Sequence, residues 1–192
     1  MSLYDHYQPG PAAGARIDKN GENWTLVLVR ELRHAPDKVW LALTDPAQLA
    51  EWAPFNASRN MASVGPVSLS TVNAPVEQVS QTEVTRAIEP ELLEYKWGDG
   101  QLRWELEPAG QGTRLTLWHG IERPYIAMGA AGWHICIDVL DHFIAGQPLG
   151  RIVGMGVMQF GGWQRLKAEY EQQFGIKAPD WSSSASSGAK SE

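Results

Sequence analysis

The chain has 192 residues, a length that suits one hydrophobic core and is short for two. Hydrophobic residues make up 43% of the chain and charged residues 20%, which is ordinary for a globular domain. The net charge is -6 and Lys and Arg form no cluster, so the composition disfavours binding to nucleic acid or to an anionic membrane surface.

The two ends of the chain differ from its middle. Residues 1–21 are rich in Gly, Pro and Ala, residues 178–192 are rich in Ser, and neither segment has hydrophobic periodicity. We expect two flexible tails around one domain at 22–177. That domain starts with a strand at 25–33.

Two short helices follow the first strand. Pro36 and Pro46 each stand where a helix accepts proline in its first turn. Asp45 is placed to cap the second helix, with Gln48 at the capping-box position three residues on. The second helix is expected to end near Trp52, so the pair would close one end of a sheet.

The middle of the chain alternates apolar and polar residues, the pattern of an antiparallel sheet with one dry face. Strands are predicted at 67–72, 79–88, 93–97, 102–107 and 114–119. The periodicity leaves the register of 79–88 open, because a slip of one residue exchanges its two faces. Either Glu83 or Arg86 is therefore a candidate to face the interior.

The most apolar segment is residues 130–146. On a helix, one stripe collects Trp133, Cys136, Ile137, Leu140, Phe143 and Ile144, and Ile135 and Val139 widen it beyond half the circumference. Such a helix is expected to be covered on two sides. A last helix is predicted at 163–174, ended by Gly175.

Four sequence segments are similar to those of a known family: HAPDKVWLALTDPAQLAEW, IEPELLEYKWG, ELEPAGQGTRLTLWHG and AAGWHICIDVLDHFIAG. They resemble the bacterial family named after the activator of the ninety-kilodalton heat-shock-protein ATPase, within the START-like superfamily, over residues 24–174. The resemblance implies an α+β helix-grip fold, in which a curved antiparallel sheet wraps round a long helix. Related families bind hydrophobic molecules, some cyclise polyketides, and the eukaryotic activators bind the chaperone.

Candidate cavity residues come from the aromatic side chains and from the buried helix. Each could serve as core packing or as the wall of a ligand pocket. The set comprises Trp52, Phe55, Trp97, Trp104, Trp133, Ile137 and Leu140, together with His119 and the two strand candidates Glu83 and Arg86.

Three residues have a competing chemical interpretation. His119 shares the inward phase of its strand. It is a candidate ligand contact or general base, and the alternative is a strand-end histidine whose hydrogen bonds are satisfied by backbone or water. His134 shares a helical face with Asp138 and Asp141, but no fourth ligand is evident, so a solvated face with a local His–Asp pair is favoured over a metal site. Cys136 is expected to be core packing.

The preferred hypothesis is a protein that binds a small hydrophobic or amphipathic molecule between sheet and helix, with no cofactor. The alternatives are a cyclase- or dehydratase-like enzyme that uses His119 with Glu83 or Arg86, and a chaperone-linked interaction module. The single cysteine and the lack of a signal-peptide pattern favour the cytoplasm. No apolar run is long enough for membrane insertion.

Overall fold

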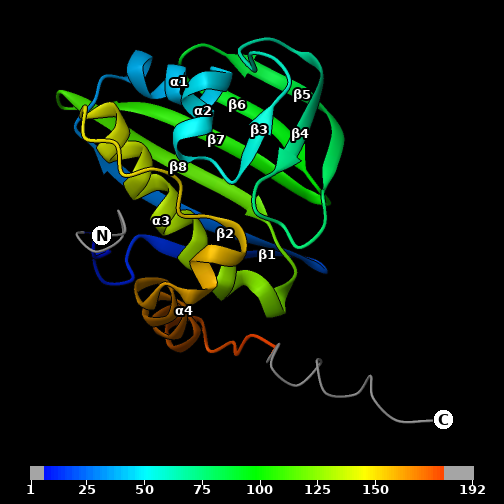
Figure 1. The fold of residues 1–192 in the computed structure, drawn as a ribbon, viewed down its shortest axis with the longest axis vertical. Coiled ribbons are helices and arrows are strands. Elements are labelled where there is room, and N and C mark those ends of the chain that lie inside the picture. The colour runs from blue at the N-terminus through cyan, green and yellow to red at the C-terminus, as the bar shows by residue number, and fades with distance from the viewer. Residues whose placement is uncertain (1–6, 180–192) are drawn as a thin grey trace.

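Residues 7–179 are described by a computed structural model in which eight strands form one antiparallel sheet. The sheet order is β1-β2-β8-β7-β6-β5-β4-β3. The strands are β1 (Ala15–Asn20), β2 (Asn23–Leu32), β3 (Phe55–Ala57), β4 (Gly65–Thr71), β5 (Val79–Ile88), β6 (Leu92–Trp97), β7 (Gly100–Ala109) and β8 (Gly112–Gly120). The sheet curls around one long helix, α3 (Ile126–Ile144), as Figure 1 shows.

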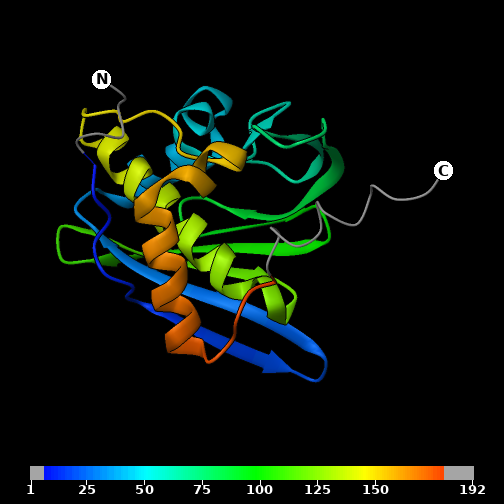
Figure 2. The same cartoon turned by 60° about the horizontal axis from the view of Figure 1, so that its bottom comes forward.

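Three further helices surround this grip. The helices α1 (Pro36–Thr44) and α2 (Pro46–Trp52) follow β2, and α4 (Gly161–Phe174) packs on α3, as Figure 2 shows. The backbone N–H of Gln48 donates to Asp45 Oδ1 over 3.0 Å, which is the cap that the sequence predicts for α2. Gly175 ends α4 in the left-handed conformation at φ 65°.

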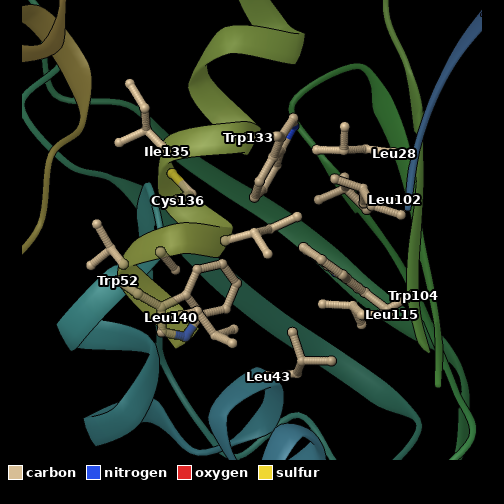
Figure 3. Packing of buried hydrophobic residues seen from close by; sticks show 14 of the residues in the cluster. Leu28, Leu43, Trp52, Leu102, Trp104, Leu115, Trp133, Ile135, Cys136 and Leu140 are labelled. Atoms are coloured by element: carbon tan, nitrogen blue, oxygen red, sulfur yellow. The ribbon is translucent and has the colours of Figure 1, made fainter. Parts of the chain in front are cut away.

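The long helix is apolar on nearly every side. Its buried residues include Trp133, Ile135, Ile137 and Leu140, each no more than 3% exposed. In Figure 3, Trp133 projects towards the sheet residues Leu28 and Leu102, whereas Ile135 lies on the other side of the helix. The prediction of a helix covered on two sides is therefore confirmed, and with it the helix-grip fold.

The N-terminal segment differs from the predicted flexible tail. Residues 15–20 form β1 and pair with β2, and Tyr7 is only 6% exposed. The segment is ordered because its polar backbone finds partners: Ala12 N donates to Glu169, and Arg30 donates to Ala13 O. Of the predicted tail at 178–192, all but the first two residues lie outside the described part of the chain.

Candidate functional site

A pocket of about 560 Å³ lies where the sheet and the first half of α3 diverge. The sheet contributes Trp97, Gly100 and His119, and α3 contributes Met128, Gly132, Trp133 and Cys136. Two short 3-10 helices, η2 (Arg123–Tyr125) and η3 (Gly154–Gln159), and Trp163 of α4 supply the remaining walls. This volume lies within the usual range for small-molecule sites, and most of the lining is apolar.

The outer wall is held in place by one close backbone approach. Gly154 has φ 66°, and a Cβ there would lie 2.5 Å from the carbonyl oxygen of Asn73. The next residue, Met155, donates its backbone N–H to that same oxygen over 3.0 Å. Only glycine fits this contact, which fixes η3 against the residues that follow β4.

Three aromatic rings meet at the inner end of the pocket. Trp97 and His119 stack with ring centroids 6.0 Å apart at 26°. Trp133 stands nearly perpendicular to both, with centroid distances of 5.9 Å to Trp97 and 5.8 Å to His119. Edge-to-face contacts of this kind are favourable, so the rings support one another beside the empty volume.

His119 is held in one tautomer by its neighbour. The indole Nε1–H of Trp133 donates to His119 Nδ1 over 2.9 Å, and an indole nitrogen can only donate. Burial lowers the pKa of His119 to about 4, so the ring is neutral at physiological pH. A neutral ring whose Nδ1 accepts a hydrogen bond carries its proton on Nε2.

The charged residues at the pocket mouth are acidic. Asp99 and Glu122 are exposed and border the opening, while no Lys or Arg belongs to the lining within residues 7–179. The nearby Arg123 stacks its guanidinium over Trp24, 5.5 Å from the ring centroid. An anion entering the pocket would therefore meet like charges and no cation among these residues.

The predicted cavity residues separate into two groups. Trp97, His119 and Trp133 line the pocket, so their inward placement agrees with the sequence prediction. The other apolar candidates are packed in the core behind it and do not belong to the lining: Trp52, Phe55, Trp104, Ile137 and Leu140. They support the wall, since the Trp104 ring meets Trp133 edge to face at 5.5 Å.

Glu83 and Arg86 are corrected by the structure, because both are exposed on β5 and neither reaches the pocket. Val84 takes the inward position instead and is fully buried. A β-bulge between Val84 and Arg86 breaks the alternation of β5, so Thr85 and Arg86 are both exposed. Arg86 then lies 3.5 Å from Glu94 on the outer face of the sheet.

His134 itself is buried, which corrects the expected solvated face at this residue, whereas the expected local pair is present because His134 Nε2 lies 3.6 Å from Asp138 Oδ2. His134 is 4% exposed and its Nδ1 lies 2.9 Å from both Arg30 and Tyr170. Asp141 remains half exposed and pairs with His34 at 2.7 Å. Within residues 7–179 no group of His, Cys, Asp and Glu side chains is placed to hold a metal ion.

Cys136 is both buried and part of the pocket lining. Burial raises the pKa of its thiol to about 12, which keeps it protonated at physiological pH. The thiol therefore contributes apolar surface to the wall and is not an activated nucleophile.

Several lining residues were missed by the sequence argument. Ile152, Val153 and Val157 come from a Gly-rich stretch without periodicity, and Trp163 entered the prediction only as the first residue of the last helix. Gly132 was missed because a glycine inside a helix gives no hydrophobic signal. The glycines at 150, 154 and 156 were the available hint of an irregular segment close to another backbone.

An antiparallel sheet that grips one long helix and leaves a pocket beside it defines a protein with the helix-grip fold. The chain belongs to the Activator of Hsp90 ATPase homolog 1-like protein family, whose model matches residues 33–145. No curated protein matches the chain. Among residues 7–179, no helix is long and apolar enough to cross a membrane.

Solved structures show the same fold at low sequence identity. CalU16 from Micromonospora echinospora is 19% identical with a TM-score of 0.59, over 87% of this chain and 96% of that one. A conserved protein of unknown function from Enterococcus faecalis, EF2215, is 15% identical with a TM-score of 0.61, over 83% and 89%. DynU16, from the dynemicin biosynthetic locus, is 19% identical with a TM-score of 0.56, over 67% and 50%.

Proposed function

We propose that this protein binds a small, mostly apolar molecule in the pocket between the sheet and α3. The observation that carries the proposal is the cavity of about 560 Å³, walled by Trp97, Trp133 and Trp163. Burial of aromatic and aliphatic ligand surface against such walls contributes roughly 25 cal/mol per Å². DynU16, which shares the fold, comes from a biosynthetic locus, and this agrees with a role in handling small molecules.

The alternative hypothesis of an enzyme lacks the second catalytic residue that it needs in the pocket. It required His119 together with Glu83 or Arg86, and both strand residues are exposed outside the pocket. His119 itself carries its proton on Nε2 at physiological pH, so it cannot accept a second one readily. The chaperone contact implied by the family stays a prediction, for which retention of the purified chaperone on this protein is the test.

Gly132 offers a direct way to test the pocket. It borders the cavity from the middle of α3, and a Cβ built there meets no atom within 4 Å. Gly132→Trp would fill the hollow without displacing backbone, whereas Gly132→Ala adds one methyl group and serves as the control. Both substitutions also replace a helix-interior glycine with a better helix former.

The probe is N-phenyl-1-naphthylamine, a neutral dye whose fluorescence rises in apolar surroundings. Wild-type protein and Gly132→Ala are expected to raise its fluorescence saturably, and Gly132→Trp to weaken binding by at least about tenfold. Thermal unfolding of each variant checks that all three are folded. Failure of the folded wild type to bind the dye, or equal binding by Gly132→Trp, would refute the proposed function.

A further inference from the structure

We propose that the pocket selects an uncharged aromatic molecule that carries a hydrogen-bond acceptor such as a ketone oxygen, and that the Nε2–H of His119 donates to it. This inference rests on the proposed function and specifies its ligand class. Three observations carry it: the position of one nitrogen in the pocket wall, the residue that fixes its proton, and the charges at the pocket mouth.

The first step is the place of the nitrogen. His119 lines the pocket and is 8% exposed, so most of its imidazole is packed in the wall of the pocket. Its Nε2 has no hydrogen-bond partner within residues 7–179. A Cβ on Gly100, another lining residue, would lie 2.6 Å from Nε2, so the glycine leaves this nitrogen uncovered.

The second step is the proton. Trp133 donates to Nδ1, which leaves Nε2 as the protonated nitrogen of the neutral ring. Trp133 is therefore a positioning residue: its indole decides that the pocket presents a donor and not an acceptor. This N–H has no protein partner in the described chain, so a ligand oxygen that accepts from it gains one hydrogen bond that a ligand of equal shape without an acceptor cannot make.

The third step is charge. A carboxylate ligand would also offer an acceptor, but it would bring a negative charge between Asp99, Glu122 and an apolar floor. No Lys or Arg lines the pocket in the described part of the chain, so such an anion would be desolvated without a counter-ion there. The geometry therefore favours ketones over fatty acids and other carboxylates.

Three naphthalenes of nearly equal shape separate these requirements: 2-acetylnaphthalene, 2-isopropenylnaphthalene and 2-naphthoate. Each competes with N-phenyl-1-naphthylamine on the full chain at pH 7. The ketone is expected to bind about three- to tenfold more tightly than the alkene, the range for one net hydrogen bond. The carboxylate is expected to bind at least about tenfold more weakly than the ketone.

Variants of His119 and Trp133 test whether the preference for the ketone depends on the proton at His119 Nε2. In His119→Phe the preference for the ketone over the alkene should vanish, and in His119→Gln, whose amide keeps an N–H, part of it should return. In Trp133→Phe the ring is free to exchange tautomers, so the ketone should lose its advantage and the donor 2-naphthol should gain affinity. Nitrogen NMR of the wild-type imidazole should show a protonated Nε2 and an unprotonated Nδ1.

The outcomes distinguish this inference from the proposed function. If the dye binds but the alkene competes as well as the ketone, or the carboxylate binds most tightly, the inference is wrong and the pocket remains a ligand site. The same follows if the ketone preference persists in His119→Phe. An NMR spectrum with the proton on Nδ1 overturns the inference without any variant. Loss of dye binding in the wild type refutes the proposed function itself.

Discussion

Trp133 and His134 are neighbours on α3, yet they face two differently constructed regions. The side chain of His134 faces α4, and its Nδ1 lies 2.9 Å from both Arg30 and Tyr170. On the same side, the hydroxyl of Tyr7 donates to Asp138 over 2.5 Å. We call this set of polar contacts, formed by Tyr7, Arg30, His134, Asp138 and Tyr170, the buried polar cluster.

Trp133 instead borders the pocket, where one nitrogen of His119 has no partner in the described chain. The N-terminal segment contacts the buried polar cluster through Tyr7 and Ala13, whereas η3 on the pocket side is fixed against Asn73 at Gly154. The long helix is covered on both sides, but beside Trp133 a pocket of about 560 Å³ remains between the helix and the segments that cover it. The difference indicates that the hollow is a fixed feature of the packing, which a ligand can use without remodelling the core.

The largest expected effect is a loss of stability, which should be greater for truncation of Trp104 in the core than for truncation of Trp133 beside the pocket. Trp104 is fully buried, while Trp133 already lacks packing partners on the pocket side. Trp104→Ala is expected to reduce the free energy of unfolding by about 3–5 kcal/mol, and Trp133→Ala by about 1 kcal/mol less. Chemical denaturation measures both. Equal losses would mean that the volume beside Trp133 closes in solution.

The second test uses pH, because both regions hold a buried histidine. Burial lowers the pKa of His119 and of His134 from 6.5 to about 4, with the Arg30 and Arg165 charges adding to the shift at His134. Between these values the unfolded chain binds protons that the folded chain does not, so stability falls as the pH drops. Each histidine contributes up to about 1.4 kcal/mol per pH unit.

His119→Gln isolates the pocket contribution to this pH dependence. Asp138 acts in the opposite direction, since burial raises its pKa, and Asp99 and Glu122 face His119 across the pocket. Because these groups remain in the variant, the difference between the two pH profiles reports His119. Denaturation midpoints between pH 7 and pH 4 should fall less steeply in His119→Gln than in the wild type, and parallel profiles would contradict a buried neutral His119.

A smaller effect is expected in the buried polar cluster. Tyr7→Phe removes the hydroxyl that donates to Asp138 and leaves that carboxylate half-buried without this partner. The expected loss is about 1–2 kcal/mol in the free energy of unfolding at pH 7, with dye binding in the pocket unchanged. Altered dye affinity in this variant would show that the two sides of α3 are coupled.

The sequence predicted most of the helices and strands because their signals are local. The cap at Asp45, the alternation of β6 to β8 and the apolar stripe of α3 each follow from a short stretch of residues. The strand β1 was missed because Ala15–Asn20 has little hydrophobic pattern and is ordered by contacts distant in sequence, such as Arg30 with Ala13.

The inward orientation of a side chain was predictable only where strand phase decides it, as it does for Trp97 and His119. A bulge in β5 overturned the interior placement considered for Arg86, and a bulge has no reliable periodic signal. The wall at Ile152 and Val153 depends on tertiary contacts alone. The hollow itself is an absence of atoms, which no residue pattern encodes directly.

The smallest expected effect compares two glycines one turn apart on α3. Gly132 faces the pocket and a Cβ there meets nothing, whereas a Cβ on Gly129 would lie 2.5 Å from Ile121 Cδ1. Gly132→Ala should stabilise the protein by about 0.5–1 kcal/mol, the usual gain for alanine over glycine inside a helix. Gly129→Ala has the same helix propensity but must displace the Ile121 side chain, so it should gain less or lose stability. Thermal unfolding of this matched pair isolates the free space over Gly132, and an equal response from both would mean that the side chains near the pocket close over it in solution.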